Sequence, residues 1–412
     1  MNLDIPYIRV GTSYFKIIEK PLISGDKVKV MVRWNRETIK TDHGKTFLEK
    51  VMKLDGFCCI PNHIDYSLIT ENFYNTYHEL PVKVIDEDLT LEQLENNIKN
   101  SLNFIKHIFG EQFDYGLDYL KLLYEKPTQI LPILCLISKE RSTGKSSFIK
   151  FLKSIFGMNM TYIKGDSFSS QFNNDWSSAL LVAIDEVFFD KKEITERLKY
   201  LSTTDKEKVE AKGKDRVEIE FFAKFILCSN NEDNFIQIDE QEIRFWIRKI
   251  KPLKNEDVHF LDKLNKEIPY LLKYLTKIEF KTKQKTRMWF TREQIMTDSL
   301  LRLMSNNKIE ISLLELINEC FESFSDEEAI NLSPIEILLM LKRINPKIYI
   351  DSPNEIIKIL KKWNFEPENN TKSYKGIEFL SHAEFVKIDR RGRFYNIKKE
   401  DFYKIFDAVT QN

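Results

Sequence analysis

Six consecutive residues at 142–147 have the side chains and the spacing of a phosphate-binding loop. They are Ser142, Thr143, Gly144, Lys145, Ser146 and Ser147. An apolar stretch at 133–137 precedes them and an amphipathic one at 147–152 follows, which predicts a strand, a loop and a helix. The first N–H groups of the helix would face phosphate oxygens, Lys145 would reach the terminal phosphates, and the Ser146 hydroxyl would hold Mg²⁺. The sequence therefore predicts a site for ATP and Mg²⁺.

Lys139 stands where such loops usually have their first glycine, five residues before Gly144. The residues that carry the chemistry, Lys145 and Ser146, are both present. Taken alone, the run also fits an ordinary basic helix that starts after a core strand. Polar side chains at the ends of the neighbouring predicted strands distinguish these two interpretations.

Two carboxylates, Asp185 and Glu186, follow a second apolar stretch at 179–184. A continuous apolar run of this length is typical of a strand that is buried on both faces of a parallel sheet. Ligands of open α/β sheets bind at the carboxyl ends of the strands. We expect Asp185 to lie in the outer shell of Mg²⁺ and Glu186 to orient and deprotonate the attacking water. The alternative is a strand that simply ends in exposed acids.

A third apolar strand is predicted at 223–231 and ends in Asn230. The amide of Asn230 would lie beside the γ-phosphate and position the water; the alternative is a turn-forming asparagine. Arg244 follows shortly afterwards. We expect it to enter the site of a neighbouring subunit as an arginine finger, which stabilises transition-state charge. Arg248 remains a second candidate, and either arginine could instead pair with acids on its own surface.

A basic hairpin is predicted between the acidic pair and the asparagine strand. Residues 217–221 alternate between apolar and polar side chains, and residues 208–211 alternate on the other side of Gly213. Lys212 and Lys214 flank this glycine at the tip. Two lysines on a protruding tip suit the phosphates of a single DNA strand, although a solvated lysine-rich turn has the same composition.

The order of phosphate loop, acidic pair, basic hairpin, asparagine strand and arginine resembles the superfamily 3 helicases, which are AAA+ ring motors. The resemblance is greatest to the helicase part of phage and poxvirus-type primase-helicases. It covers residues 127–255, and the segment 73–77 is similar to the lead-in of such proteins. The resemblance implies a homo-oligomeric ring, a hexamer, whose hairpin lysines Lys212 and Lys214 grip DNA in the channel. It also implies Asn230 as the sensor and Arg244 as the finger.

Composition limits where nucleic acid could bind. The 412 residues contain 63 basic and 63 acidic side chains, so bulk charge cannot attract DNA and local basic patches must do so. The five cysteines form no C-x-x-C pair, which favours a reducing compartment. No apolar stretch approaches the length of a membrane span. We therefore expect a soluble protein of the bacterial host cytoplasm that does not bind membranes.

The predicted fold class is α/β: an AAA+ ATPase core with a parallel sheet at 127–255, between smaller regions. Residues 1–85 should be a small α+β region with a strand at 27–34. Residues 86–126 should form helices, and the family resemblance suggests a collar that holds the ring together. Residues 256–290 are predicted as a helical, basic linker. Because residues 1–85 are too short for a primase, a separate primase is an expected partner.

A winged-helix domain is predicted for residues 291–412. Three helices are expected at 313–321, 334–342 and 353–363, with proline at the start of the second and third. A hairpin is expected at 385–397 with an arginine-rich tip. The tip residues Arg390, Arg391 and Arg393 would contact phosphates of DNA. The alternative is a winged helix that binds protein and has a merely solvated wing.

These observations lead to three hypotheses about function. The first is an ATP-driven replicative helicase of a phage or plasmid that acts on single-stranded or forked DNA. The second is an AAA+ ATPase that loads or remodels a protein complex on DNA without unwinding. The third is a DNA-binding initiator without catalysis. The paired lysines of the hairpin favour the first hypothesis over the second, and the intact Lys145, Asp185 and Glu186 favour it over the third.

Overall fold

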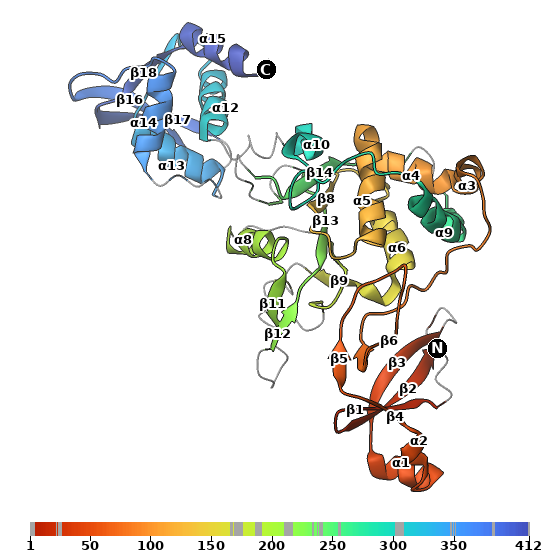
Figure 1. Cartoon of the computed structure of the whole chain (residues 1–412). Helices are drawn as coiled ribbons and strands as arrows, with labels where there is room; N and C mark the ends of the chain where they lie inside the picture. Colours follow the sequence, from red (N-terminus) through yellow and green to blue (C-terminus); the bar gives the residue numbers. More distant parts are fainter. Residues whose placement is uncertain are drawn as a thin grey trace. The chain divides into compact units, whose positions relative to one another are not determined.

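The computed structural model describes residues 5–21, 23, 27–164, 168, 176–185, 192–209, 217–232, 235–236, 238, 242–253, 257–300, 309–346, 348, 350, 352–380 and 384–410. The chain folds as two compact units (Figure 1). The larger unit contains residues 1–187, 193–232 and 243–297, and the smaller one contains 188–192, 233–242 and 298–412. The predicted boundaries after residues 85, 126 and 255 therefore fall inside one unit.

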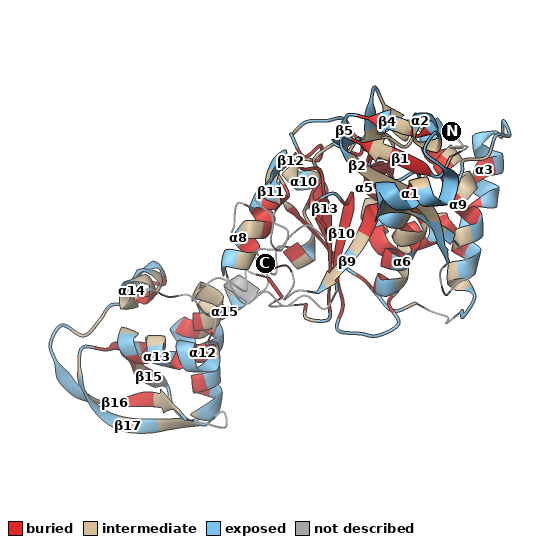
Figure 2. Cartoon of the chain, turned by 90° about the horizontal axis from the view of Figure 1, so that it is seen from below, coloured by how far each residue is buried: buried red, intermediate tan, exposed pale blue. Residues whose placement is uncertain are grey.

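A parallel sheet of five strands forms the centre of the larger unit. Its strands are β14 (Phe245–Lys249), β8 (Ile133–Ile137), β13 (Lys224–Ser229), β10 (Leu181–Asp185) and β9 (Met160–Lys164), in this spatial order. Every neighbouring pair is parallel. Two of the inner strands, β8 and β13, are buried along their whole length, as their continuous apolar sequences require. Figure 2 shows the buried β13 in red. The strands predicted from the sequence at these places are confirmed.

Helices pack with this sheet around one shared hydrophobic core. They are α3 (Leu91–Asn97), α4 (Lys99–Phe109), α5 (Phe113–Glu125), α6 (Lys145–Phe156) and α9 (Phe260–Lys277), with short turns η1 (Gly110–Gln112), η2 (Gly157–Asn159) and α10 (Arg292–Ile295). Thr90 and Gln93 form the expected capping box before α3. Every helix in the described part of the chain is too short or too polar to span a lipid bilayer.

The helix predicted within 256–290 is confirmed as α9, but this segment is not a linker, because α9 belongs to the core. Its Leu264, Ile268, Leu271 and Leu275 are buried at helical spacing. The buried carboxylate of Glu267 also accepts hydrogen bonds from the first N–H groups of α4, those of residues 100 and 101, at 3.2 and 2.7 Å. A carboxylate is stabilised there by the helix dipole, so α9 is fastened to the start of α4.

The N-terminal part contains two small sheets. The first has the order β3 (Lys27–Trp34), β2 (Ser13–Pro21), β1 (Tyr7–Val10) and β4 (Met52–Leu54), with α1 (Arg36–His43) and α2 (Phe47–Lys50) beside it. The second consists of β5 (Gly56–Cys58), β7 (Phe73–Asn75) and β6 (Ile69–Thr70). The buried amide of Asn75 accepts from the N–H groups of Ile60 and Tyr77, both at 3.0 Å. In the segment 73–77, Asn75 is therefore a structural tie.

A hairpin and a helix extend from the sheet. Helix α8 (Lys192–Leu201) is followed by β11 (Lys206–Val209) and β12 (Val217–Glu220), which pair antiparallel. The hairpin predicted before the asparagine strand is confirmed. Its predicted tip residues Lys212 and Lys214 lie outside the described residues.

The smaller unit has its own hydrophobic core. Its elements are α12 (Ile309–Ser323), β15 (Ala329–Leu332), α13 (Pro334–Ile344), α14 (Pro353–Lys362), β16 (Lys372–Phe379), β17 (Phe385–Gly392), β18 (Tyr395–Lys398) and α15 (Lys399–Thr410). Strand β16 pairs with β17, and β15 pairs with β18, both antiparallel. The three predicted helices are confirmed, including their starts at Pro334 and Pro353.

The predicted arginine-rich hairpin tip at 390–393 is wrong. Arg390 and Arg391 lie in β17, opposite Tyr374 and Ser373 of β16, and Arg393 follows β17. Strand β16 pairs with β17 from Lys372 opposite Gly392 to Phe379 opposite Phe385, so the arginines lie at the end of the ladder away from the β16–β17 connection. Because Gly392 lies between arginines, the sequence suggested a turn, but Gly392 is paired within the ladder. Arg390 is also engaged with acids, since its Nε lies 3.6 Å from Glu336 Oε1.

Candidate functional site

Three predicted site residues meet where the strands of the central sheet have their carboxyl ends, which is the edge meant below. Lys145 starts α6 after the loop that follows β8, Asp185 is the last residue of β10, and Asn230 follows β13. The register pairs Ile137 with Ser229 and Ile184 with Leu227, so the three strands end at the same edge. Carboxyl ends of parallel strands are where open α/β sheets bind ligands. The structure thus brings together the loop, the carboxylate and the amide that the sequence suggested.

The loop itself has the backbone that phosphate binding requires. Gly144 has φ of +89°, a backbone conformation that favours glycine, and a Cβ there would also lie close to the Phe104 ring, at 3.0 Å. Ser142 adopts a φ of 53° as well. Lys139 is not among the residues with positive φ, so the glycine usually found at its position is dispensable here. After Gly144, the first turn of α6 leaves N–H groups without intrahelical partners, which are donors for an anion.

Lys145 is held in place among loop oxygens. It is 8% exposed, and its Nζ donates to the carbonyl of Ser138 at 3.2 Å and to Thr143 Oγ1 at 3.3 Å. Burial lowers the pKa of Lys145, while the carboxylate of Asp185 acts in the opposite direction. These two long hydrogen bonds are ones that phosphate oxygens can replace, and phosphate charge would stabilise the ammonium form.

The donor set at this edge fits a nucleotide with Mg²⁺. Ser146 at the start of α6 and Asp185 at the end of β10 are both exposed, so a hydroxyl and a carboxylate are accessible beside the buried lysine. Hydroxyl and carboxylate oxygens are ligands that Mg²⁺ prefers. Glu186, the predicted catalytic base, lies outside the described residues.

Two further contacts brace the loop from elements that the sequence did not connect with it. The Nε2 of His107 in α4 lies 3.0 Å from the carbonyl oxygen of Thr143. The N–H of Leu253, beyond β14, donates to the carbonyl of Ser142 at 2.9 Å. The helices at 86–126, predicted as a collar, therefore contact the phosphate loop directly.

Glu232 joins the carboxyl ends of three adjacent strands. It follows β13, and its side chain is 6% exposed. Its Oε1 accepts from the N–H of Lys139 after β8 at 2.9 Å, and its Oε2 lies 2.7 Å from Lys249 Nζ at the end of β14. Burial raises the pKa of Glu232, but hydrogen bonds from Lys249 and Lys139 outweigh it and leave the pKa below its ordinary value. Sequence reasoning missed Glu232, although its place just after Asn230 was a usable signal.

Replacing Glu232 by glutamine should lower the free energy of unfolding at neutral pH by about 1–2 kcal/mol, because Lys249 loses its charged partner. If the loop at 139–144 binds ATP, the KM for ATP should also rise, since Lys139 begins this loop. A carboxylate with a lowered pKa stabilises the fold above its unfolded pKa and ceases to do so as pH falls through the folded value. Urea denaturation at pH 7 and pH 4 checks this.

Glu140→Gln is the matched control, because Glu140 is exposed in the same loop, whereas Glu232 is buried and accepts the N–H of Lys139. It should leave stability and KM unchanged. If Glu232→Gln were as stable as wild type at pH 7, or if the stability difference stayed constant down to pH 4, the link between the strands would be energetically unimportant.

Arg244 lies at the opposite edge of the sheet from the phosphate loop. It directly precedes β14, and its carbonyl accepts from the N–H of Ile133, where β8 begins. The loop follows the other end of β8, so the two sites are separated by five residues of strand, on the order of 15 Å. An arginine side chain does not span this length. If Arg244 acts on a nucleotide, that nucleotide is bound by another subunit.

Arg248 is engaged within its own chain. Its Nη1 donates to Gln112 Oε1 at 2.8 Å and its Nε donates to the carbonyl of Ile108 at 3.3 Å. Its guanidinium also lies against Gly110, where a Cβ would be 2.6 Å from Nη2. Arg248 therefore fastens β14 to the end of α4, which is a structural role within its own chain.

Comparisons with known proteins match part of the sequence to a family and nearly the whole chain to a known fold. A family of unknown function (DUF5906) matches residues 136–248, the stretch from the phosphate loop to β14. No curated protein is similar enough in sequence to count as a relative. Solved structures of the NrS-1 C-terminal region share the fold: an apo A form (residues 305–718) at 16% identity and TM-score 0.53, covering 96% of both chains. A second apo structure gives 15% identity and TM-score 0.54, covering 95% of both chains.

Proposed function

We propose that this chain is an ATP-dependent DNA helicase of phage or plasmid replication that works as a ring, in which each ATP lies between two subunits. One observation carries the proposal. The sheet places Lys145, Asp185 and Asn230 at one edge and Arg244 at the opposite edge of the same subunit. An arginine finger that is separated in this way from its own phosphate loop needs a neighbour, and a head-to-tail ring supplies one to every subunit.

Hydrolysis of ATP at this site would follow from positioning and electrostatics. Bound Mg²⁺ would neutralise charge on the phosphates. Lys145 would donate to the transferred phosphoryl group, and Ser146 and Asp185 would orient the metal's ligands. Asn230 would position the attacking water, and Glu186, next after β10 in sequence, would accept its proton. Arg244 of the neighbouring subunit would stabilise the charge that develops on the γ-phosphate.

The hairpin β11–β12 is the proposed DNA grip, with Lys212 and Lys214 at its tip. It leads directly into β13, whose far end carries Asn230. A change at the nucleotide edge therefore has a short, rigid route to the hairpin. The helices α3 to α5 are proposed as the collar. They come after the N-terminal sheets and before β8 in the chain, and they pack on the core.

The smaller unit is proposed as a winged helix that contacts DNA. The order α12, β15, α13, α14, β16, β17 and the β15–β18 pairing support this fold. Arg391 and Arg393 are exposed and are the proposed phosphate contacts, whereas Arg390 is engaged with Glu336. A separate primase is a proposed partner.

The test is unwinding of a forked duplex in the presence of ATP and Mg²⁺, with ATPase measured in parallel. Wild type should unwind the fork. Lys212→Ala/Lys214→Ala should lose unwinding while its basal ATPase survives, because its nucleotide site is unchanged. Wild-type ATPase without unwinding would instead favour a remodelling ATPase, and neither activity would favour a DNA-binding initiator.

A further inference from the structure

A rigid basic segment lies between α9 and α10, away from the nucleotide edge. Its exposed cations are Lys281, Lys283, Lys285 and Arg287. Thr282 between them is buried, and the carboxylate of Asp118 accepts from its N–H at 2.7 Å and from its hydroxyl at 2.6 Å. The indole N–H of Trp289 donates to the same hydroxyl at 2.8 Å. The segment therefore presents its cations on a fixed backbone, which reduces the entropy lost when a ligand binds.

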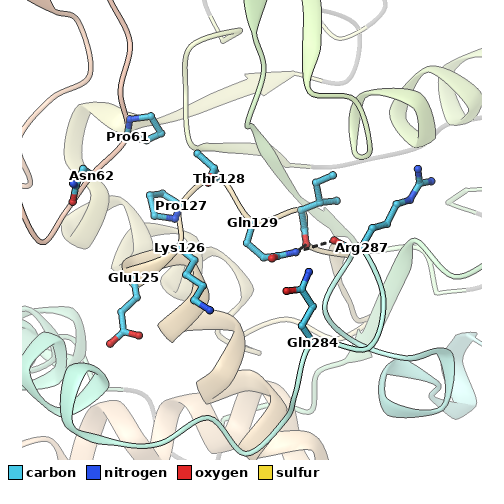
Figure 3. Close-up of a pocket in the computed structure, with 10 residues that line it drawn as sticks. Pro61, Asn62, Glu125, Lys126, Pro127, Thr128, Gln129, Gln284 and Arg287 are labelled. Carbon is cyan, nitrogen blue, oxygen red and sulfur yellow. Dashed lines mark hydrogen bonds between the residues drawn. The ribbon is translucent and has the colours of Figure 1, made fainter. Parts of the chain in front are cut away.

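This segment borders a surface hollow of about 590 Å³ (Figure 3). Asn62, Gln129 and Gln284 contribute amides to the lining, and Lys126 and Arg287 contribute cations. The Nε2 of Gln129 donates to the carbonyl of Arg287 at 2.8 Å, which joins the loop before β8 to the basic segment. In Figure 3 the two cations lie on either side of the glutamine amides and do not converge on one point.

The charge of the hollow is positive. Among the described residues that line it, Glu125 carries the one carboxylate, and this lies 2.5 Å from Lys121 Nζ. Lys126 Nζ lies 4.8 Å from the centre of the Trp289 ring, a contact that orients the ammonium group without neutralising it. Since the whole chain has a formal net charge of +0, such a local excess of cations is a specific feature.

The hollow lies at the edge of the sheet from which the hairpin emerges. The buried Lys224, first residue of β13, donates from its Nζ to the carbonyl of Pro127 in the wall of the hollow and to that of Phe222 at 2.7 Å. The next residue back, Phe221, donates its N–H to the carbonyl of Asp205 beside β11 at 2.8 Å. Lys224 therefore connects the base of the hairpin with the wall of the hollow.

We propose that the hollow and the segment 281–287, together called the basic hollow, bind the backbone phosphates of single-stranded nucleic acid. Cations that flank a row of amides suit a chain of phosphates better than one compact anion, because neighbouring phosphates are held apart by sugars. The binding needs no nucleotide hydrolysis, so it goes beyond the proposed motor and is tested without ATP.

The experiment uses fluorescence anisotropy of a labelled oligothymidine over a range of KCl concentrations. Lys283→Gln/Lys285→Gln/Arg287→Gln should lower the affinity at low salt by about tenfold or more, and each lost phosphate contact should reduce the salt slope by about 0.7. Lys99→Gln/Lys106→Gln/Lys266→Gln removes equal charge from exposed positions of α4 and α9 and should retain the affinity and slope of wild type. Equal affinities and slopes for both triple variants and wild type would overturn the proposal.

A second measurement separates this surface from the hairpin and from the smaller unit. Acetylation of lysines is followed by mass spectrometry with and without oligothymidine. Lys126, Lys283 and Lys285 should be protected by the oligonucleotide, and unchanged acetylation at all three would contradict the proposal. Inorganic pyrophosphate is the competing probe. If micromolar pyrophosphate displaced the oligonucleotide or gave the same protection, the hollow would be a site for a compact anion. Lys145→Ala should lose ATPase activity but keep wild-type oligonucleotide affinity and lysine protection. Failure of the motor proposal can therefore be told apart from failure of this one.

Discussion

Replacing Lys145 by alanine is expected to lower kcat/KM for ATP hydrolysis by at least about 100-fold, the typical cost of losing one preorganised charge in a catalytic site. The side chain is nearly buried, and its ammonium group lies where the loop oxygens of Ser138 and Thr143 converge. Steady-state ATPase measured with saturating Mg²⁺ checks the prediction, and equilibrium nucleotide binding shows whether affinity falls too.

The matched control is Lys150→Ala, which removes an exposed lysine from the same helix. It should retain wild-type ATPase, since Lys150 lies beyond the first turn of α6. Thermal denaturation of both variants excludes a general loss of structure. ATPase of Lys145→Ala within a fewfold of wild type would show that phosphates bind elsewhere, and the proposed site would then be wrong.

The proposed phosphate loop could be placed from the sequence because its geometry is local. Gly144, Lys145 and Ser146 would bind phosphate through their own backbone and the first turn of α6, and the apolar run before them identifies the strand. Asp185 and Asn230 were predictable for a similar reason, since each ends an apolar strand. Parallel strands have their carboxyl ends on the same side of a sheet, so the two residues were expected to lie near the loop. The strand register confirms this arrangement.

Features that depend on distant partners were not predictable. Glu232 matters through Lys139, which follows β8, and Lys249, which ends β14. Its place after Asn230 marks it as near the site, but nothing local in the sequence indicates these two partners. The segment 256–290 was interpreted as a linker because lysines dominate the composition of 254–285 and obscured the buried face that Leu264 and Leu271 give to α9. The segment 385–397 was mistaken for a complete hairpin because its true partner, β16, has an unremarkable sequence that gains meaning only from the pairing with β17.

The two edges of the central sheet suggest how the proposed activities are divided. The nucleotide residues lie at the carboxyl ends of the strands, whereas the hairpin base, the basic hollow and Arg244 lie at or near the amino ends. Strands β8 and β13 are buried throughout and run from one of these edges to the other. Lys249 and Arg244, at opposite ends of β14, link the Glu232 contact with the proposed intersubunit arginine. A shift of β14 would therefore move both Lys249 and Arg244.

Replacing Arg244 by alanine is expected to lower the ATPase kcat by about 1,000-fold or more, as for other arginine fingers, without weakening nucleotide binding to the same extent. The reason is geometric: Arg244 directly precedes β14, beside the start of β8, and the proposed phosphate loop follows the end of β8. Arg36→Ala, which removes an exposed arginine from α1, is the control and should keep wild-type activity.

Mixing the two inactive variants tests whether Arg244 acts between subunits. In a ring of Lys145→Ala and Arg244→Ala subunits, an interface is complete when the loop comes from an Arg244→Ala subunit and the arginine from a Lys145→Ala neighbour. With equal amounts and random assembly, about a quarter of the interfaces meet this condition, so ATPase should recover toward that fraction. A mixture that forms rings of normal mass but stays as inactive as its components would contradict an intersubunit role, because a residue acting within its own subunit cannot be complemented. Recovery would require that one subunit's phosphate loop and its neighbour's β14 build a single site, which is what their separation across the sheet implies.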